Sequence, residues 1–157
     1  MKTPNKILPA TAILLAMLLV GVIVQKQLAV NDQTIAVVLP PNRDCDLQRG
    51  DCASGLPEGG YMRFSIEPRP IPVLRPIKLI VTVQNVNASK VEVDFTGVSM
   101  KMGYNRTLLR PNAAGRFEGE TTLPICSSGG MTWRATVLLE IGGKRVAVPF
   151  EFVTSRN

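Results

Sequence analysis

The sequence predicts an all-β fold preceded by one apolar N-terminal segment. From Tyr61 onward, apolar and polar residues alternate with a period of two, which is typical of half-buried strands. About seven such runs recur at roughly 8–12-residue spacing, with Gly- and Pro-containing turns between them. We therefore expect an immunoglobulin-like antiparallel β-sandwich, preceded by a single N-terminal transmembrane helix.

The N-terminal segment is the run "ILPATAILLAMLLVGVIV", Ile7–Val24, which contains no charged residue. As a helix it would span roughly 27 Å, close to the ~30 Å apolar core of a bilayer. A cleaved signal peptide is the alternative, but the following "QKQLAVNDQ" has no clean A-x-A cleavage site. We expect an uncleaved transmembrane anchor over residues 7–24.

The charges around this segment predict its orientation. Lys2 and Lys6 precede it and Lys26 follows it, so the positive-inside rule favours cytoplasmic residues 1–6. We expect a single-pass protein of the bacterial inner membrane with its C-terminal domain in the periplasm. The net charge of +6 comes from scattered residues with few aromatics among them, which disfavours nucleic acid as a partner.

About 130 residues follow the anchor, enough for one domain. We expect an extracytoplasmic linker with a cysteine-containing loop over residues 25–60, then the β-sandwich over 61–157. Within the linker, "QTIAVVLPP" is either an edge strand or a chain lying against the domain. Four prolines in "EPRPIPVLRP" exclude helix and central strand and favour an extended edge segment.

The strands are predicted by alternation, run by run. The segments "YMRFSI", "IKLIVTVQ", "KVEVDF", "GRFEGETTLP", "MTWRATVLLEI" and "KRVAVPFEF" each place apolar residues on one face. The clearest inward sets are Ile77, Leu79, Val81 and Val83; Val91, Val93 and Phe95; Phe117, Thr121 and Leu123; Met131, Trp133, Ala135, Val137, Leu139 and Ile141; and Val146, Val148, Phe150 and Phe152. Gly142-Gly143 should join the last two runs as a tight hairpin.

The side-chain inventory limits catalysis. The chain has no histidine, which removes Ser-His-Asp and Cys-His catalysis and most zinc enzymes. The carboxylates lie mostly at outward strand positions, and no pair forms an acid/base dyad. We therefore expect no enzymatic activity and no catalytic or organic-cofactor-binding residues.

Three cysteines allow three pairings. Cys45 and Cys52 lie seven residues apart in a loop with Gly50, so a loop-closing disulfide between them is sterically easy, and we expect this pairing. Alternatively, one of them pairs with Cys126 and fixes the N-terminal loop to the domain. No C-x-x-C motif is present, which disfavours a thiol-redox role.

Four sulfur-containing residues form a candidate metal site. Met100 and Met102 lie two apart in "VSMKMGYNR", and Cys126 and Met131 bound the turn in "LPICSSGGMTW". Soft sulfur ligands select Cu(I), and thioethers resist the oxidation that damages thiols in an exported compartment. We expect these four residues to bind copper(I), with ordinary core packing of the methionines as the alternative.

The residues Met100–Gly103, Leu108, Gly115–Glu120 and Leu123–Trp133 together resemble the FixH-type and YtkA-like proteins. The resemblance implies an N-terminal membrane anchor and an immunoglobulin-like periplasmic domain. It also implies an accessory role in copper supply or in the assembly of a membrane complex, and the complex that it implies is a haem-copper oxidase. The alternative is a non-metal structural or protein-interaction module that docks on an inner-membrane complex through the Pro-rich edge.

Overall fold

The computed structural model of the chain describes residues 15–22, 25, 35–42, 44–99, 105–113, 115–124 and 130–154. The chain divides into two units, residues 1–34 and 35–157. In the first, residues 15–22 are helical, and the rest of the predicted anchor Ile7–Val24 lies outside the described residues. Among the helical residues that are described, none belongs to a helix long and apolar enough to cross a membrane.

The second unit is all-β, as the sequence predicts. Its described residues form nine strands in one sheet, with a short 3₁₀ turn, η1 (Pro57–Gly59), between the second and third. In chain order the strands are β1 (Ile35–Val38), β2 (Cys52–Gly55), β3 (Tyr61–Glu67), β4 (Pro76–Gln84), β5 (Ala88–Gly97), β6 (Arg106–Ala113), β7 (Arg116–Thr122), β8 (Met131–Ile141) and β9 (Lys144–Thr154).

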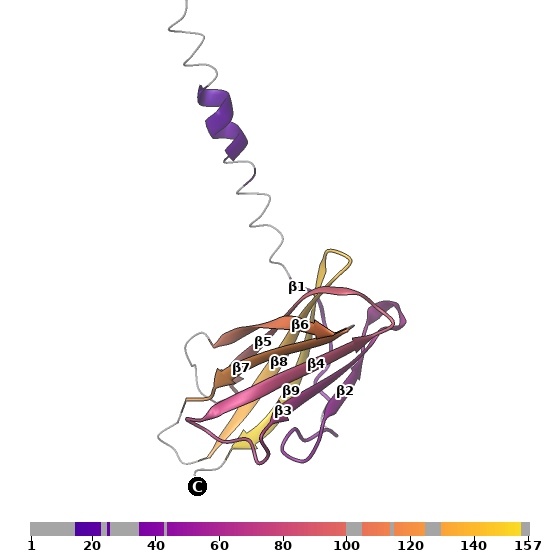
Figure 1. Cartoon of the computed structure of the whole chain (residues 1–157), viewed down its shortest axis with the longest axis vertical. Coiled ribbons are helices and arrows are strands. Elements are labelled where there is room, and N and C mark those ends of the chain that lie inside the picture. The colour runs from indigo at the N-terminus through magenta and orange to yellow at the C-terminus, as the bar shows by residue number, and fades with distance from the viewer. Residues whose placement is uncertain are drawn as a thin grey trace, which may run out of the picture. The chain divides into compact units, whose positions relative to one another are not determined.

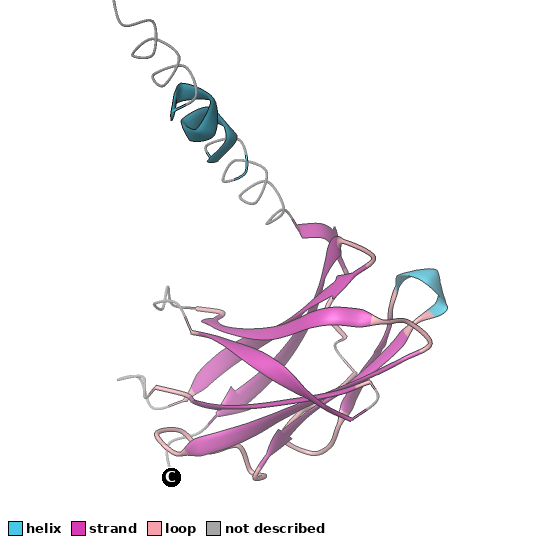
Figure 2. Cartoon of the chain, turned by 45° about the horizontal axis from the view of Figure 1, so that its top comes forward, coloured by secondary structure: helices cyan, strands magenta, loops and turns pink. Residues whose placement is uncertain are grey.

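The sheet is continuous and curls on itself, which differs from the two separate sheets of the predicted sandwich. Its strand order is β1-β9-β8-β5-β6-β7-β4-β3-β2 (Figure 1). Strand β6 makes the connection, because its first half pairs with β5 and its second half with β7. The sheet folds over at β6, so that the strands before and after β6 in the strand order face each other as two layers of one sheet. Figure 2 shows this curvature.

The predicted alternation matches the buried faces. The inward residues of β4, β5, β8 and β9 are buried, and on β4, β5 and β8 most of their neighbours in sequence are more exposed. On β9, Arg145, Ala147 and Pro149 are buried too, so this strand is covered on both faces over that stretch. The predicted hairpin is also present: Gly142 and Gly143 both have positive φ, the conformation a type I′ turn requires.

The core lies between the two layers. Phe64 of β3 and Phe150 of β9 approach across it, with ring centroids 5.7 Å apart. Trp133 is buried, and its indole Nε1 donates a hydrogen bond to Thr154 Oγ1 at 3.0 Å. Leu47 is fully buried in the same cluster although it belongs to no strand.

The β-domain begins earlier than the expected boundary at Tyr61. Strand β1 pairs in parallel with β9, and β2 pairs antiparallel with β3, so two short strands within residues 25–60 belong to the sheet. Of the two alternatives for "QTIAVVLPP", the edge strand is correct. The Pro-rich segment, residues 68–75, lies instead outside the sheet, because its prolines have no N–H to donate to a ladder.

Leu47 provides a test of how far this core extends beyond the strands. We expect Leu47→Ala to lower the free energy of unfolding by about 2–5 kcal/mol, since it leaves a cavity in a packed interior. Leu108→Ala is the matched control: Leu108 is 55% exposed on β6, so its loss should change stability by under about 0.5 kcal/mol. Urea unfolding followed by the fluorescence of Trp133, the only tryptophan, measures both. Equal losses would contradict the packing of Leu47 in the core.

Candidate functional site

The predicted sulfur site is only partly within the described residues. Met131 begins β8 and is 5% exposed, packed in the core cluster. Met100, Met102 and Cys126 lie outside the described residues, so the proposed ligand set as a whole is untested. Among the described residues, no group of three or more His, Cys, Asp or Glu side chains could hold a metal ion.

The residues that flank the two undescribed segments do lie close together. Val98 donates its N–H to the Thr132 carbonyl at 3.0 Å, directly beside Met131. Asn105 accepts a hydrogen bond from Phe95 N–H at 2.9 Å, and its side chain contacts Thr121 Oγ1 at 3.4 Å. Residues 100–104 and 125–129 are therefore bounded by positions at the same end of the sheet as Met131.

A second site is formed by the cysteine-containing loop. Cys45 and Cys52 are joined by a disulfide with their Cα atoms 5.6 Å apart, which confirms the loop-closing pairing and excludes either one pairing with Cys126. Cys52 is the first residue of β2 and is fully buried, so the bond fixes the loop to the end strand of the sheet.

The segment before β2 connects the two ends of the curled sheet. Leu39 N–H donates to the Ala147 carbonyl of β9 at 2.9 Å. Asn42 Nδ2 donates to the Ala53 carbonyl of β2 at 3.2 Å, and Gln48 Nε2 donates to the Val153 carbonyl of β9 at 2.7 Å. Residues 39–51 therefore bridge β9 and β2, which are far apart in the strand order.

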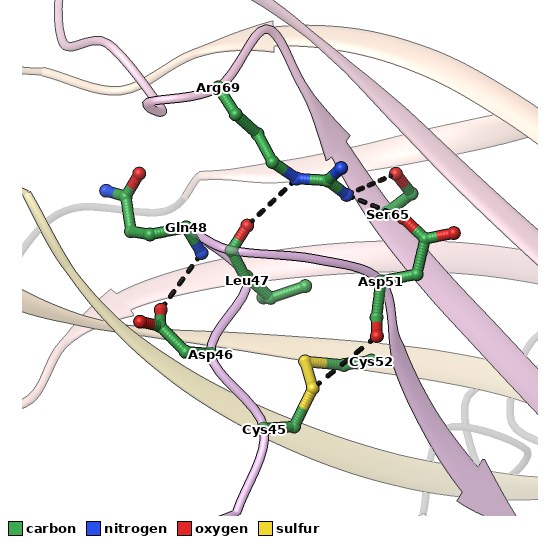
Figure 3. A network of polar contacts seen from close by, with 8 residues as sticks. All are labelled: Cys45, Asp46, Leu47, Gln48, Asp51, Cys52, Ser65 and Arg69. Carbon is green, nitrogen blue, oxygen red and sulfur yellow. Dashed lines mark hydrogen bonds and ion pairs between the residues drawn. A yellow bond between two sulfur atoms is a disulfide. The ribbon is translucent and has the colours of Figure 1, made fainter.

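Arg69 holds this bridge from the Pro-rich segment (Figure 3). Its Nε donates to the Leu47 carbonyl at 3.2 Å, and its Nη2 donates to Asp51 Oδ1 at 2.6 Å and Ser65 Oγ at 2.8 Å. The hydrogen bond from Arg69 lowers the pKa of the Asp51 carboxyl below its usual 3.8, with a smaller contribution from Ser65. The Arg69 side chain is partly buried and that of Asp51 is exposed, and the loop is fixed by these charge-assisted bonds as well as by the disulfide.

Gln48 joins the loop to the Pro-rich segment. Its Oε1 accepts the Ile71 N–H at 2.7 Å while its Nε2 contacts β9, so one amide links three parts of the chain. Beside this amide lies a groove of about 670 Å³. Its walls are the four prolines of residues 68–76 with Ile71 and Val73, and its polar groups come from Gln48, Arg69 and Arg75.

Sequence reasoning identified the Cys45–Cys52 loop and the Pro-rich segment but not their contact. Arg69 lies between Pro68 and Pro70, neither of which has a backbone N–H donor. A long, charged side chain in such a segment is the one signal that could have indicated a side-chain tether. The partners of Arg69 are separated from it by up to 22 residues, a distance that no local pattern encodes.

Comparison with known proteins identifies no family. No protein-family model matches the chain, and no curated protein matches it. The function of this chain is therefore inferred from its own residues and geometry.

The disulfide makes a measurable contribution to stability. We expect the variant Cys45→Ser/Cys52→Ser to lose about 2–3 kcal/mol of unfolding free energy, since the link removes entropy from the unfolded chain over a short loop. Urea unfolding of the full chain under oxidising conditions measures this loss. Reductant should lower the native protein to the same value and leave the variant unchanged. A variant as stable as the oxidised protein would show that the loop needs no covalent closure.

Proposed function

We propose that this chain is an envelope protein whose β-domain works outside the cytoplasm as an accessory module on a membrane protein complex. The observation that carries the proposal is the Cys45–Cys52 disulfide, because such bonds form and persist in oxidising compartments. The uncharged run Ile7–Val24 supports delivery to, and tethering in, a bacterial inner membrane with the β-domain in the periplasm.

The proposed role is binding rather than catalysis. The described domain is a curled sheet with a packed core, closed by a covalently and ionically fixed loop. Beside that loop, a preformed groove offers a place for a partner to dock. The proposal includes the immunoglobulin-like class and the FixH-type or YtkA-like relationship, supported by the sequence motif and the all-β architecture.

The compartment and the partner are tested together in the native host. The full-length protein, quenched in acid and alkylated before mass spectrometry, should carry a Cys45–Cys52 disulfide. A chain lacking residues 2–24 should stay in the cytoplasm with both thiols alkylated. After mild detergent extraction, the full-length protein should comigrate on native gels with a larger membrane complex at fixed stoichiometry.

Two outcomes would contradict this function. Reduced cysteines in the full-length protein would place the domain in a reducing compartment. Migration of the oxidised protein alone, both before and after chemical cross-linking in intact cells, would remove the membrane complex as its partner.

Copper(I) handling is the second candidate function. In this role the protein would bind Cu(I) and assist the assembly of a haem-copper oxidase. The positions of described residues near residues 100–104 and 125–129 favour this candidate. Val98 and Asn105 lie at the same end of the sheet as Met131. A Cu(I) site there would draw on Met100, Met102 and Cys126, with Met131 at its base.

Copper binding is tested by titrating the full-length protein in detergent with Cu(I) against a competing chelator. We expect the protein to bind one equivalent of Cu(I). The affinity for Cu(I) should fall at least about tenfold in Met100→Ala/Met102→Ala, because each substitution removes one soft sulfur ligand. Met62→Leu is the matched control, since Met62 is fully buried in β3. Unchanged binding in the double variant, or no stoichiometric binding, would reject the copper site.

A further inference from the structure

The groove beside the disulfide loop carries an unbalanced charge. Its lining includes two arginines, Arg69 and Arg75, and no carboxylate. Arg69 is paired with Asp51, and its Nε and Nη2 groups donate the three bonds that hold the loop. Arg75 is exposed, and within the described part of the chain it forms no ion pair. The groove therefore presents one available positive charge at its rim.

The residue next to this charge is an apolar side chain held outward. Leu74 is 59% exposed and has a φ of 57°, a conformation that is uncommon for a leucine. Its N–H donates to the Leu123 carbonyl at 2.9 Å, which fixes the backbone in that position.

The backbone of the groove is richer in acceptors than in donors. The four prolines of residues 68–76 have no N–H, and the N–H groups of Ile71 and Leu74 are already bonded to Gln48 and Leu123. Proline rings and carbonyl oxygens remain available to a ligand. Such a wall suits an extended chain that supplies its own N–H donors and places apolar side chains against the rings.

We propose that this groove binds an extended acidic peptide segment of the membrane partner, with an apolar side chain against the proline wall and a carboxylate on Arg75. The assignment deepens the proposed function and rests on it for the source of the peptide. The concave shape favours a peptide over a lipid surface, since about 670 Å³ is in the range of pockets that enclose a ligand rather than a flat contact. The groove is preorganised, because Gln48 and Arg69 bond to its walls and the backbone bond of Leu74 to Leu123 fixes the chain between Val73 and Arg75.

Binding is tested by fluorescence polarisation with the full-length protein in detergent. The probes are labelled octapeptides that alternate aromatic and acidic residues, and a matched set with amides in place of the acids. We expect saturable binding of the acidic set only, weakened about fivefold or more in Arg75→Glu. Lys144→Glu is the charge-matched control, because Lys144 is exposed at the start of β9 and does not line the groove.

Three results would overturn the assignment: equal binding of the acidic and amide probes, equal weakening by both substitutions, or no binding by either set. Binding of anionic lipid vesicles in place of the peptides would also overturn it. The same Arg75→Glu variant separates this inference from the proposed function. If Arg75→Glu still comigrates with the membrane complex at the native stoichiometry, the groove assignment fails and the docking function survives.

Discussion

The structure depends on the closure of its curled sheet by residues 39–51. A sheet that curves without forming a barrel leaves an open side between its end strands, where the core would meet water. Here the chain before β2 crosses that side, places Leu47 in the core, and bonds to β9 and β2. Arg69 then fixes the crossing from the opposite direction through Leu47 and Asp51, so two segments outside the sheet hold one another in place.

The groove follows from the same closure. Gln48 is positioned by the loop, and it in turn positions Ile71 and the proline wall. Because Arg69 is paired with Asp51 in holding the loop, most of its charge is offset within the domain, whereas the exposed Arg75 forms no ion pair with the described residues. Arg69 therefore stabilises the fold, while Arg75 places a positive charge at the rim of the groove. This explains how one short segment, residues 68–76, can do both.

Alternation in the sequence predicts the strands that have one buried face, and β4, β5 and β8 are the clearest cases. Strand β6 was not predicted, because Leu108 and Leu109 are adjacent, Pro111 interrupts the run, and the strand changes partners midway. That change of partner is what makes the sheet continuous. The loop-closing disulfide was predicted from spacing, but the contacts of Arg69 were not, since they depend on tertiary proximity.

The free energies of these bonds indicate how strongly the loop of residues 39–51 is held. A disulfide over so short a loop is worth about 2–3 kcal/mol, while each hydrogen bond from a charged group is worth about 1.5–3 kcal/mol. Because the Arg69–Asp51 pair is partly exposed, each bond of Arg69 contributes nearer to about 1 kcal/mol, so the three bonds together are comparable to the covalent link. The total free energy of unfolding of a native protein is typically about 5–15 kcal/mol. Reduction should weaken the loop without releasing it, so the disulfide acts as a structural staple and not as an on/off switch for the groove.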